Sequence, residues 1–240
     1  MKLNVWCRTD KGLRRESNQD SFLVNESLGL FVVADGMGGH SGGEVASMIA
    51  VQTVEDVVKN NREKMTTPRD LLTKAYEEAS QRIFDKAANE RPELSGMGTT
   101  MVLCYKHGSS IYIGNVGDSR VYLFRKPYLW QMTEDHSLVN EQLRAGIIND
   151  EQVKTFAGKN VITRSVGYER EVYVDILERP LQAGDCFLLC SDGLSGLVND
   201  NLISEIISQT EPEKVPEACI ERALANGGDD NVTVLFIQVA

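Results

Sequence analysis

Five aspartates in this chain stand beside apolar runs, where a strand would begin or end. Each has glycine, asparagine or glutamine next to it; they are Asp20, Asp35, Asp118, Asp192 and Asp230. A lone Asp-Gly pair is most often a plain turn, but five such acids are poorly explained as turns, because most turns do not require aspartate. Carboxylates that converge cannot all stay ionised unless cations lie between them. The pattern therefore predicts a metal site.

The ligand types indicate which metals such a site would hold. The candidate ligands all offer oxygen, the chain has only three histidines, and its five cysteines lack the paired spacing of zinc sites. Carboxylate, carbonyl and water oxygens suit Mg²⁺ or Mn²⁺. Several carboxylates imply more than one ion, and two ions about 3.5–4 Å apart are a recurring device for hydrolysing phosphate esters. We therefore expect a hydrolytic centre.

The glycine-rich stretch FVVADGMGGHSGGE, residues 31–44, allows a test of phosphate-binding loops. The dinucleotide pattern fails at Ser41, where it needs glycine, and no acidic residue ends a second strand about 20 positions later. The P-loop pattern fails at Glu44, where lysine is needed to neutralise phosphate. An aspartate at a strand end beside glycine is better suited to a hard cation.

Composition excludes several classes of protein. The chain has 240 residues, 42% hydrophobic and 25% charged, which is typical of a globular protein with a real core. Its formal net charge of −10 argues against a nonspecific nucleic-acid or anionic-membrane surface. The start has no apolar signal core and no 18-residue apolar span occurs, so we expect a cytoplasmic location. Cys186 and Cys190 would share one face of a strand, as buried thiols.

The elements that must position the acids can be outlined from apolar spacing. Helical spacing predicts helices at about 45–58 and, after Pro68, at about 72–83, with shorter ones at 200–209 and 213–225. Strands in clusters and helices in pairs favour an α+β fold, with two antiparallel sheets face to face and helices outside. Residues 136–160 are polar and irregular, and predict a flap. The predicted strands are 21–25, 29–34, 99–105, 110–116, 120–125, 172–178, 185–190 and 231–239.

Seven stretches occur in a fixed order: GLRRESNQD, VVADGMGGH, GMGTT, GNVGDSRVY, EDHS, LLCSDGL and GGDDNVT. This set resembles the metal-dependent protein phosphatases, the type 2C serine/threonine phosphatases, in their compact bacterial form. The resemblance runs from about residue 9 to about residue 239 and implies one catalytic domain over 1–240. It implies an antiparallel β-sandwich flanked by pairs of α-helices, with metals at the sheet ends, that hydrolyses phosphoserine and phosphothreonine in proteins.

The resemblance also implies which residues hold the metals. Asp35 would bridge two core ions of Mn²⁺ or Mg²⁺, and the Gly36 carbonyl with water would complete the second ion's shell. Asp192 and Asp230 would hold the first ion. Asp118, with Asp192, matches a weaker third site of bacterial members.

Residues near the chain start match the substrate side of the family's site. Asp20, and Gln19 with it, would act on the ions through water. Arg15 matches the arginine that grips the substrate phosphate, as a bidentate guanidinium does well. Arg14 is its obvious competitor for this role, and the spacing to Asn-Gln-Asp favours Arg15. Asn231 would orient Asp230.

Two positions depart from the family pattern. The animal branch has a histidine after the metal Asp-Gly as a candidate general acid, but this chain has Met37 there and His40 later. His40 could serve in its place, or it could be a capping or structural histidine. Some relatives add a serine to the third site, where this chain has Asn160. His136 is expected to organise the flap hinge, and His107 to be a turn residue.

Other functions remain to be separated from this one. A binding module of the same fold would normally have lost a core acid, and none is missing here. A regulatory phosphatase acting on anti-sigma antagonists would usually carry sensor domains, for which 240 residues leave no room. A phosphatase of small metabolites would share the metal chemistry. The expected partners are phosphorylated proteins, including a bacterial serine/threonine kinase, with the phosphatase itself a monomer.

Overall fold

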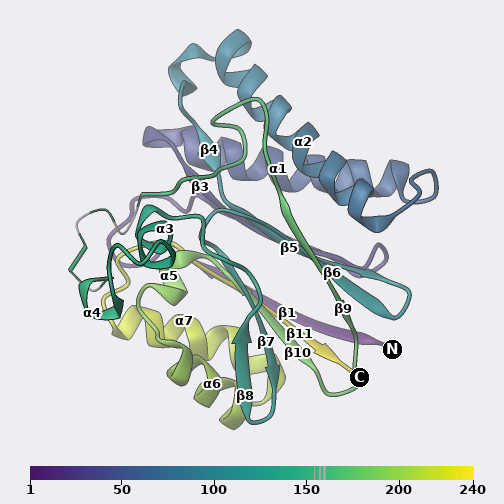
Figure 1. Ribbon diagram of the computed structural model, residues 1–240, viewed down its shortest axis with the longest axis vertical. Helices are drawn as coiled ribbons and strands as arrows, with labels where there is room; N and C mark the ends of the chain where they lie inside the picture. Colours follow the sequence, from purple (N-terminus) through teal and green to yellow (C-terminus); the bar gives the residue numbers. More distant parts are fainter. Residues whose placement is uncertain (154, 157, 159–160) are drawn as a thin grey trace.

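Two antiparallel sheets lie face to face at the centre of the protein (Figure 1). This computed structural model describes residues 1–153, 155–156, 158 and 161–240, without the side chains of residues 39–41, 90 and 150. The first sheet has the order β1-β11-β10-β7-β8 and the second has β2-β3-β5-β6-β9, with β4 beside β3. The strands are β1 (Leu3–Asp10), β2 (Asp20–Asn25), β3 (Leu30–Met37), β4 (Gly98–Thr99), β5 (Met101–His107), β6 (Ser110–Val116), β7 (Arg120–Arg125), β8 (Tyr128–Gln131), β9 (Asp175–Pro180), β10 (Cys186–Cys190) and β11 (Val232–Val239).

Helices cover the outer face of each sheet, as the spacing predicted. α1 (Gly39–Asn61) and α2 (Pro68–Asp85) pack on the second sheet, while α6 (Asp200–Gln209) and α7 (Val215–Ala225) pack on the first. Pro68 is the first residue of α2, and the Thr67 hydroxyl accepts from the Asp70 N–H to cap it. Shorter helices are α3 (Leu138–Arg144), α4 (Asp150–Val153), α5 (Asp192–Ser195), and the η segments Lys86–Glu90, Pro92–Leu94 and Pro212–Lys214. The α+β sandwich with paired helices is confirmed.

The central strands are apolar on both faces because each face packs into a different core. In β3, Phe31 and Val33 point between the sheets, while Leu30 and Val32 point under α1 and α2. In β10, Cys186 and Cys190 share the face toward α6 and α7, so the prediction of two buried thiols on one face is confirmed. Such strands read as continuous apolar runs, which is why the sequence reveals them clearly.

The edges and short elements were predicted less well. β1 and β8 were not predicted, and β9 occupies Asp175–Pro180 where 172–178 was expected. The predicted flap contains α3 and α4, and its ends meet in a bridge between Ser137 and Ile162. Figure 1 shows α3 and α4 beside the same end of the sandwich as α5.

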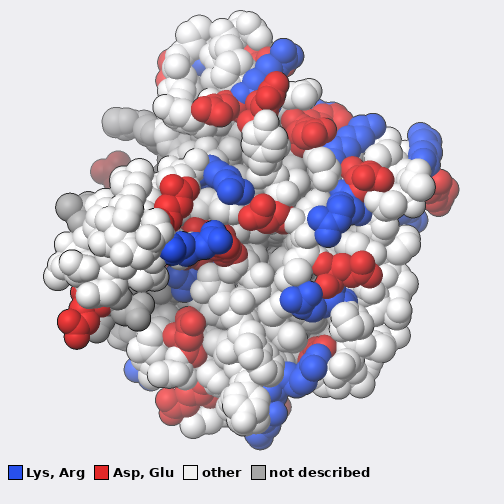
Figure 2. Space-filling model, viewed as in Figure 1, with Lys and Arg blue, Asp and Glu red and all other residues white. Residues whose placement is uncertain are grey.

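The surface carries both signs of charge. Figure 2 shows acidic and basic side chains interspersed on the face it displays. That face has no broad basic surface, which agrees with the formal net charge of −10. No helix in the described part of the chain is both long enough and apolar enough to cross a bilayer.

Candidate metal centre

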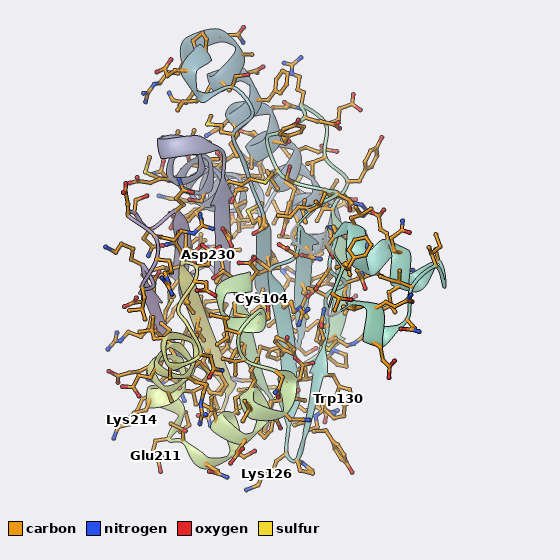
Figure 3. The ribbon with its side chains drawn as sticks, turned by 90° about the vertical axis from the view of Figure 1, so that its left-hand side faces the viewer. Cys104, Lys126, Trp130, Glu211, Lys214 and Asp230 are labelled. Carbon is orange, nitrogen blue, oxygen red and sulfur yellow. The ribbon has the colours of Figure 1, made fainter. Side chains whose placement is uncertain are left out.

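Strand pairing brings the five aspartates to one end of the sandwich. In the second sheet, Asp20 on β2 lies directly opposite Asp35 on β3. In the first sheet, Asp192 follows β10, and Asp230 precedes the neighbouring strand β11. Figure 3 labels Asp230, at the end of the sheet that faces the viewer. Asp118 lies in the turn from β6 to β7, where the chain passes between the sheets. Aspartates from both sheets therefore lie close together at this end of the sandwich.

Two carboxylate oxygens at this end are buried without a hydrogen-bond partner among the described residues. They are Oδ1 of Asp20 and Oδ1 of Asp192. The other oxygen of Asp20 accepts from the hydroxyls of Ser191, at 2.8 Å, and Thr233, at 2.7 Å. A buried carboxylate oxygen without a donor is costly, and a cation would satisfy it. This observation fits a metal at the centre of the acids.

Burial and mutual repulsion shift the pKa values of these acids upward. Burial raises the pKa of Asp20 to about 7, and the charges of Asp192 and Asp230 add to the rise. Burial also raises the pKa of Asp118 to about 7, with Asp192 and Asp135 adding to it. The pKa of Asp35 lies well above its ordinary value for the same two reasons, and that of Asp192 is raised. Without cations, these groups cannot all be ionised together.

The acids are distributed around the centre and are not gathered into one ready-made cluster. Across the described residues, no three histidine, cysteine or acidic side chains are grouped so that they alone could hold one ion. Asp35 instead contacts Asp192, and Asp192 is close to Asp230. An ion here would therefore be held by carboxylates from different elements of the fold, with water and backbone carbonyls completing its shell, as is common for Mg²⁺.

The glycines after Asp35 are required by close packing of two backbones. A Cβ on Gly36 would lie 2.0 Å from the Gly43 carbonyl oxygen in α1 and 2.7 Å from that of Gln19. The Gly36 N–H also donates to the Gln19 carbonyl at 3.2 Å. The Asp35 carbonyl accepts from the Thr100 N–H at 2.8 Å. The backbone at the end of β3 is thus fixed against α1 and against Thr100, between β4 and β5, and this packing explains the glycine directly after the aspartate.

Arg15 lies at the acids, and Arg14 does not. The Arg15 Nη2 donates to Asp230 Oδ2 at 2.6 Å, and this hydrogen bond raises the pKa of Arg15. The charges of Asp35 and Asp192 act on Arg15 in the same direction. Arg14 is 74% exposed and faces Asp229 at 3.7 Å. The structure therefore distinguishes these two adjacent arginines by position.

Three polar residues form hydrogen bonds to the aspartates. The sequence did not predict a role for two of them and predicted a different side-chain role for the third. Ser191 and Thr233 hold Asp20, and their signal was a hydroxyl residue close to an acid in SDG and DNVT. Asn231 donates to Asp230 Oδ1 through its backbone N–H at 2.8 Å. Its side chain instead holds the loop before Asp20, by accepting from the Gln19 N–H and donating to the carbonyls of Lys11 and Ser17.

The remaining candidate residues have separate positions. The His40 side chain and the whole of Asn160 lie outside the described residues. His107 ends β5 at an exposed turn, as expected of it. His136 is 4% exposed, and its Nδ1 accepts from the Gly117 N–H, next to Asp118, at 3.1 Å.

A cavity of about 600 Å³ opens beside the turn that follows Asp35. Met37 and Gly38 line one side of it, and the chain returning from the flap, 162–165, lines another. Tyr168 and Tyr173 also line it, and both are exposed. The cavity therefore adjoins the acids without being built from them.

Known proteins resemble this chain over nearly its whole length. The family model of protein phosphatase 2C matches residues 13–224. The serine/threonine phosphatase Stp of Listeria monocytogenes is 40% identical over 238 residues, covering 96% of this chain and 94% of Stp. The crystal structure of the Mycobacterium tuberculosis phosphatase PstP has a TM-score of 0.91 and 34% identity, over 100% of this chain and 99% of that one.

A second solved structure of PstP bears on the metal. Its catalytic domain, in complex with two manganese ions, matches 99% of this chain and 99% of its own with a TM-score of 0.88 and 35% identity. Family model, relatives and solved structures thus agree with one another and with the ordered stretches of the sequence. The chain belongs to the protein phosphatase 2C family of serine/threonine phosphatases.

Proposed function

We propose that this chain hydrolyses phosphoserine and phosphothreonine in proteins at a centre of two Mn²⁺ or Mg²⁺ ions, with a weaker third ion at Asp118. The observation that carries the proposal is the pair of buried, unpartnered oxygens on Asp20 and Asp192, among acids from both sheets. The donor set is all oxygen, which suits Mn²⁺ and Mg²⁺. The two manganese ions of the PstP catalytic domain support the same assignment.

The five acids would divide the ions between them. Asp35 would lie between the two core ions, with the Gly36 carbonyl contributing to one of them. Asp192 and Asp230 would hold the other ion, and Asp20 would act through water. When bound, the ions would lower the pKa of a water that attacks phosphorus and would offset charge on the phosphoryl oxygens. Asp20 is kept in place for this by Ser191 and Thr233 of the opposite sheet.

Arg15 would bind the substrate phosphate. Only its Nη2 donates to Asp230, and a guanidinium carries five N–H donors in a rigid plane. Its remaining donors can face two phosphate oxygens while the bond to Asp230 fixes its orientation. Arg14 is directed at Asp229 and would take no part.

The cavity beside the Asp35 turn would receive the residues that flank the phosphorylated side chain. It adjoins Met37 and Gly38, and its exposed Tyr168 and Tyr173 offer aromatic surface to an extended peptide. A sugar phosphate or other small metabolite would leave such surface unused. This feature supports a protein substrate, and we propose as its source the targets of a bacterial serine/threonine kinase. We further propose one catalytic domain, acting as a monomer in the cytoplasm.

The decisive experiment compares substrates in the presence and absence of metal. Phosphothreonine and phosphoserine peptides should be hydrolysed with Mn²⁺ or Mg²⁺, chelator should abolish turnover, and added metal should restore it. Sugar phosphates should react much more slowly. Robust turnover in chelator would rule out the metal mechanism, and a preference for sugar phosphates would favour a metabolite phosphatase instead. Binding of phosphopeptide without turnover would favour an inactive module.

A further inference from the structure

His136 is hydrogen-bonded to three separate parts of the chain. Its Nδ1 accepts from the Gly117 N–H at 3.1 Å, and its own N–H donates to the Gly117 carbonyl at 2.9 Å. Its carbonyl accepts from the Thr163 N–H at 2.9 Å, where the chain returns from the flap. Its Nε2 lies 2.9 Å from Asp175 Oδ2, at the start of β9. The side chain is 4% exposed, so water does not replace these contacts.

The contacts define how the imidazole carries its proton. A backbone N–H can only donate, so Nδ1 must accept from Gly117 and the ring hydrogen must be on Nε2. Nε2–H then donates to Asp175 Oδ2 at 2.9 Å, while the Arg164 Nη1, which can only donate, lies farther from Nε2 at 3.4 Å. Burial lowers the pKa of His136, which agrees with a neutral ring. Both nitrogens are therefore committed, each to a different segment.

The Gly117 turn is the segment that presents Asp118. Gly117 has φ 106°, and a Cβ there would lie 2.5 Å from Thr100 Cβ, so the turn has one narrow conformation. The adjacent Asn115 donates from its side chain to the Glu134 carbonyl at 2.7 Å. The 133–136 segment therefore supports the Asp118 turn from one side, and His136 contributes two of its bonds.

His136 also lies at the base of the flap, where the two ends of the flap meet. Ser137 and Ile162 form an antiparallel bridge, and the Leu138 N–H donates to the Val161 carbonyl at 2.8 Å. Together with the bond from Thr163 to His136, these contacts bring both ends of the flap to one point. His136 thus makes both the bonds to the Gly117 turn and a bond at the base of the flap.

We infer that His136 is a positioning residue that couples the flap to the Asp118 turn, and so sets Asp118 at the rim of the acids. The inference rests on the proposed function for its effect on turnover, but the coupling itself does not. His136 is separated from the acids by Gly117, so it acts through that residue and does not touch substrate. A flap that shifts would move Asp118, and a disordered Asp118 turn would loosen the flap base.

Two substitutions of His136 each keep one hydrogen bond of the imidazole and remove the other. In His136→Asn, Oδ1 falls near the position of Nδ1, so it can still accept from Gly117 but cannot reach Asp175. In His136→Gln, Nε2 falls near the position of the ring Nε2, so it can still donate to Asp175 but cannot accept from Gly117. Asp175→Ala is a control for the second bond: it removes the acceptor of Nε2–H, together with the 3.4 Å ion pair between Asp175 and Arg164, and leaves the imidazole and Gly117 in contact.

Amide exchange in the metal-free protein tests the coupling without any assay of activity. The Gly117 N–H should exchange on the order of ten-fold faster in His136→Gln than in His136→Asn, since it loses its acceptor. Exchange at Leu138 and Thr163 should rise in the same variant. Equal exchange in the two variants, or a rise at Gly117 alone with the flap base unchanged, would overturn the coupling.

Kinetics with saturating Mn²⁺ then test its consequence. On a phosphopeptide, kcat should fall on the order of 10- to 100-fold in His136→Gln, as expected for a displaced group. His136→Asn and Asp175→Ala should stay close to wild type, and KM should change little in all three. Equal kcat in the Gln and Asn variants, despite different Gly117 exchange, would overturn the positioning role. Failure of the wild type to hydrolyse any phosphopeptide would instead refute the proposed function and leave the exchange result standing.

Discussion

Arg15 and Asp230 form a charge-assisted hydrogen bond of 2.6 Å across 215 positions of sequence. The bond joins the residue expected to grip phosphate to one expected to hold metal. It fixes the guanidinium at the acids before any substrate arrives. Because Arg14 beside it faces Asp229 instead, the two arginines form a matched pair for mutation.

Arg15→Ala should lower kcat/KM for a phosphopeptide by about 10- to 100-fold, the usual value of a hydrogen bond between charged groups. Arg14→Ala should have little effect, since that side chain is exposed and lies outside the acids. Calorimetric titration with Mn²⁺ should stay near wild type in both. Should Arg14→Ala prove the more damaging variant, the phosphate-binding residue is misassigned by one position.

Asp230→Asn should reduce phosphopeptide hydrolysis by orders of magnitude and weaken the tightest Mn²⁺ site, because an amide cannot replace a carboxylate charge on a core ion. Asp192→Asn should behave alike, while circular dichroism stays native. Asp229→Asn is the control, since this carboxylate is 65% exposed and faces the exposed Arg14 at 3.7 Å. Normal activity in Asp230→Asn would remove this residue from the centre.

Asp118→Asn should remove one weak Mn²⁺ site by calorimetry and leave the tight sites nearly unchanged. Its turn offers one carboxylate to the rim, so an ion there keeps mostly water and binds weakly. Hydrolysis of a phosphopeptide should fall sharply, and that of an activated aryl phosphate should fall less if the third ion assists protonation of the leaving oxygen. Equal losses on both substrates would favour ordering of the flap, and loss of a tight site would place Asp118 in the core of the centre.

In metal-free protein, stability should fall as pH rises from about 4 to about 7. Asp20 and Asp118 have folded pKa values of about 7, above the ordinary 3.8 expected in the unfolded chain. The folded state therefore holds protons that the unfolded state has released in this window, and the free energy of unfolding decreases with pH, by at most about 1.4 kcal/mol per unit for each group.

Thermal unfolding in chelator checks this pH dependence. Tm should decrease between about pH 5 and about pH 7 and level off above, by roughly 2–4 °C for each kcal/mol. Asp118→Asn, which has no carboxyl to titrate, should show a shallower decrease and a higher Tm above pH 7. A Tm that rises over this window in the wild type, or an identical slope in the variant, would contradict the raised pKa values.

Gly36→Ala should disrupt both folding and activity. Its methyl group would lie 2.0 Å from the Gly43 carbonyl oxygen and 2.7 Å from that of Gln19, and backbone atoms cannot move aside cheaply. A loss of stability of several kcal/mol is expected, as for other overpacked sites. Gly42→Ala, in the first turn of α1, would place its methyl group 3.1 Å from Met97 Cβ and 3.9 Å from Met97 Cα, and should be tolerated far better. Denaturant unfolding of both variants measures the difference.

The part of the fold that the sequence predicted is the part with buried, periodic elements. β3, β10 and β11 are apolar on both faces, and α6 was predicted at its observed bounds. β1 was not predicted because LNVWCRTD mixes charged and apolar residues and only its first residue, Leu3, is buried. β8 is a four-residue edge strand with exposed Tyr128, and α3 and α4 are short, so local pattern was too weak to reveal them.

The aspartates of the candidate site were predictable from the sequence, but the residues that hydrogen-bond to them were not. The position of the aspartates at strand ends made them predictable. When several acids stand at the ends of buried strands, they need partners that offset their charge. The bonds of Ser191 and Thr233 to Asp20 join different sheets, and no local spacing encodes a contact between residues 171 or 213 positions apart. The pairing of Arg15 with Asp230 depends in the same way on how β11 meets the opening loop.

Because the aspartates come from both sheets, ions held among them would fasten one layer of the sandwich to the other. A chain that has lost its ions would then open more often at that end and offer itself more often to proteases. Shortage of metal would in that case act twice, by slowing each molecule and by shortening its survival. The number of phosphatase molecules, and with it the lifetime of phosphate on their targets, would follow the metal supply.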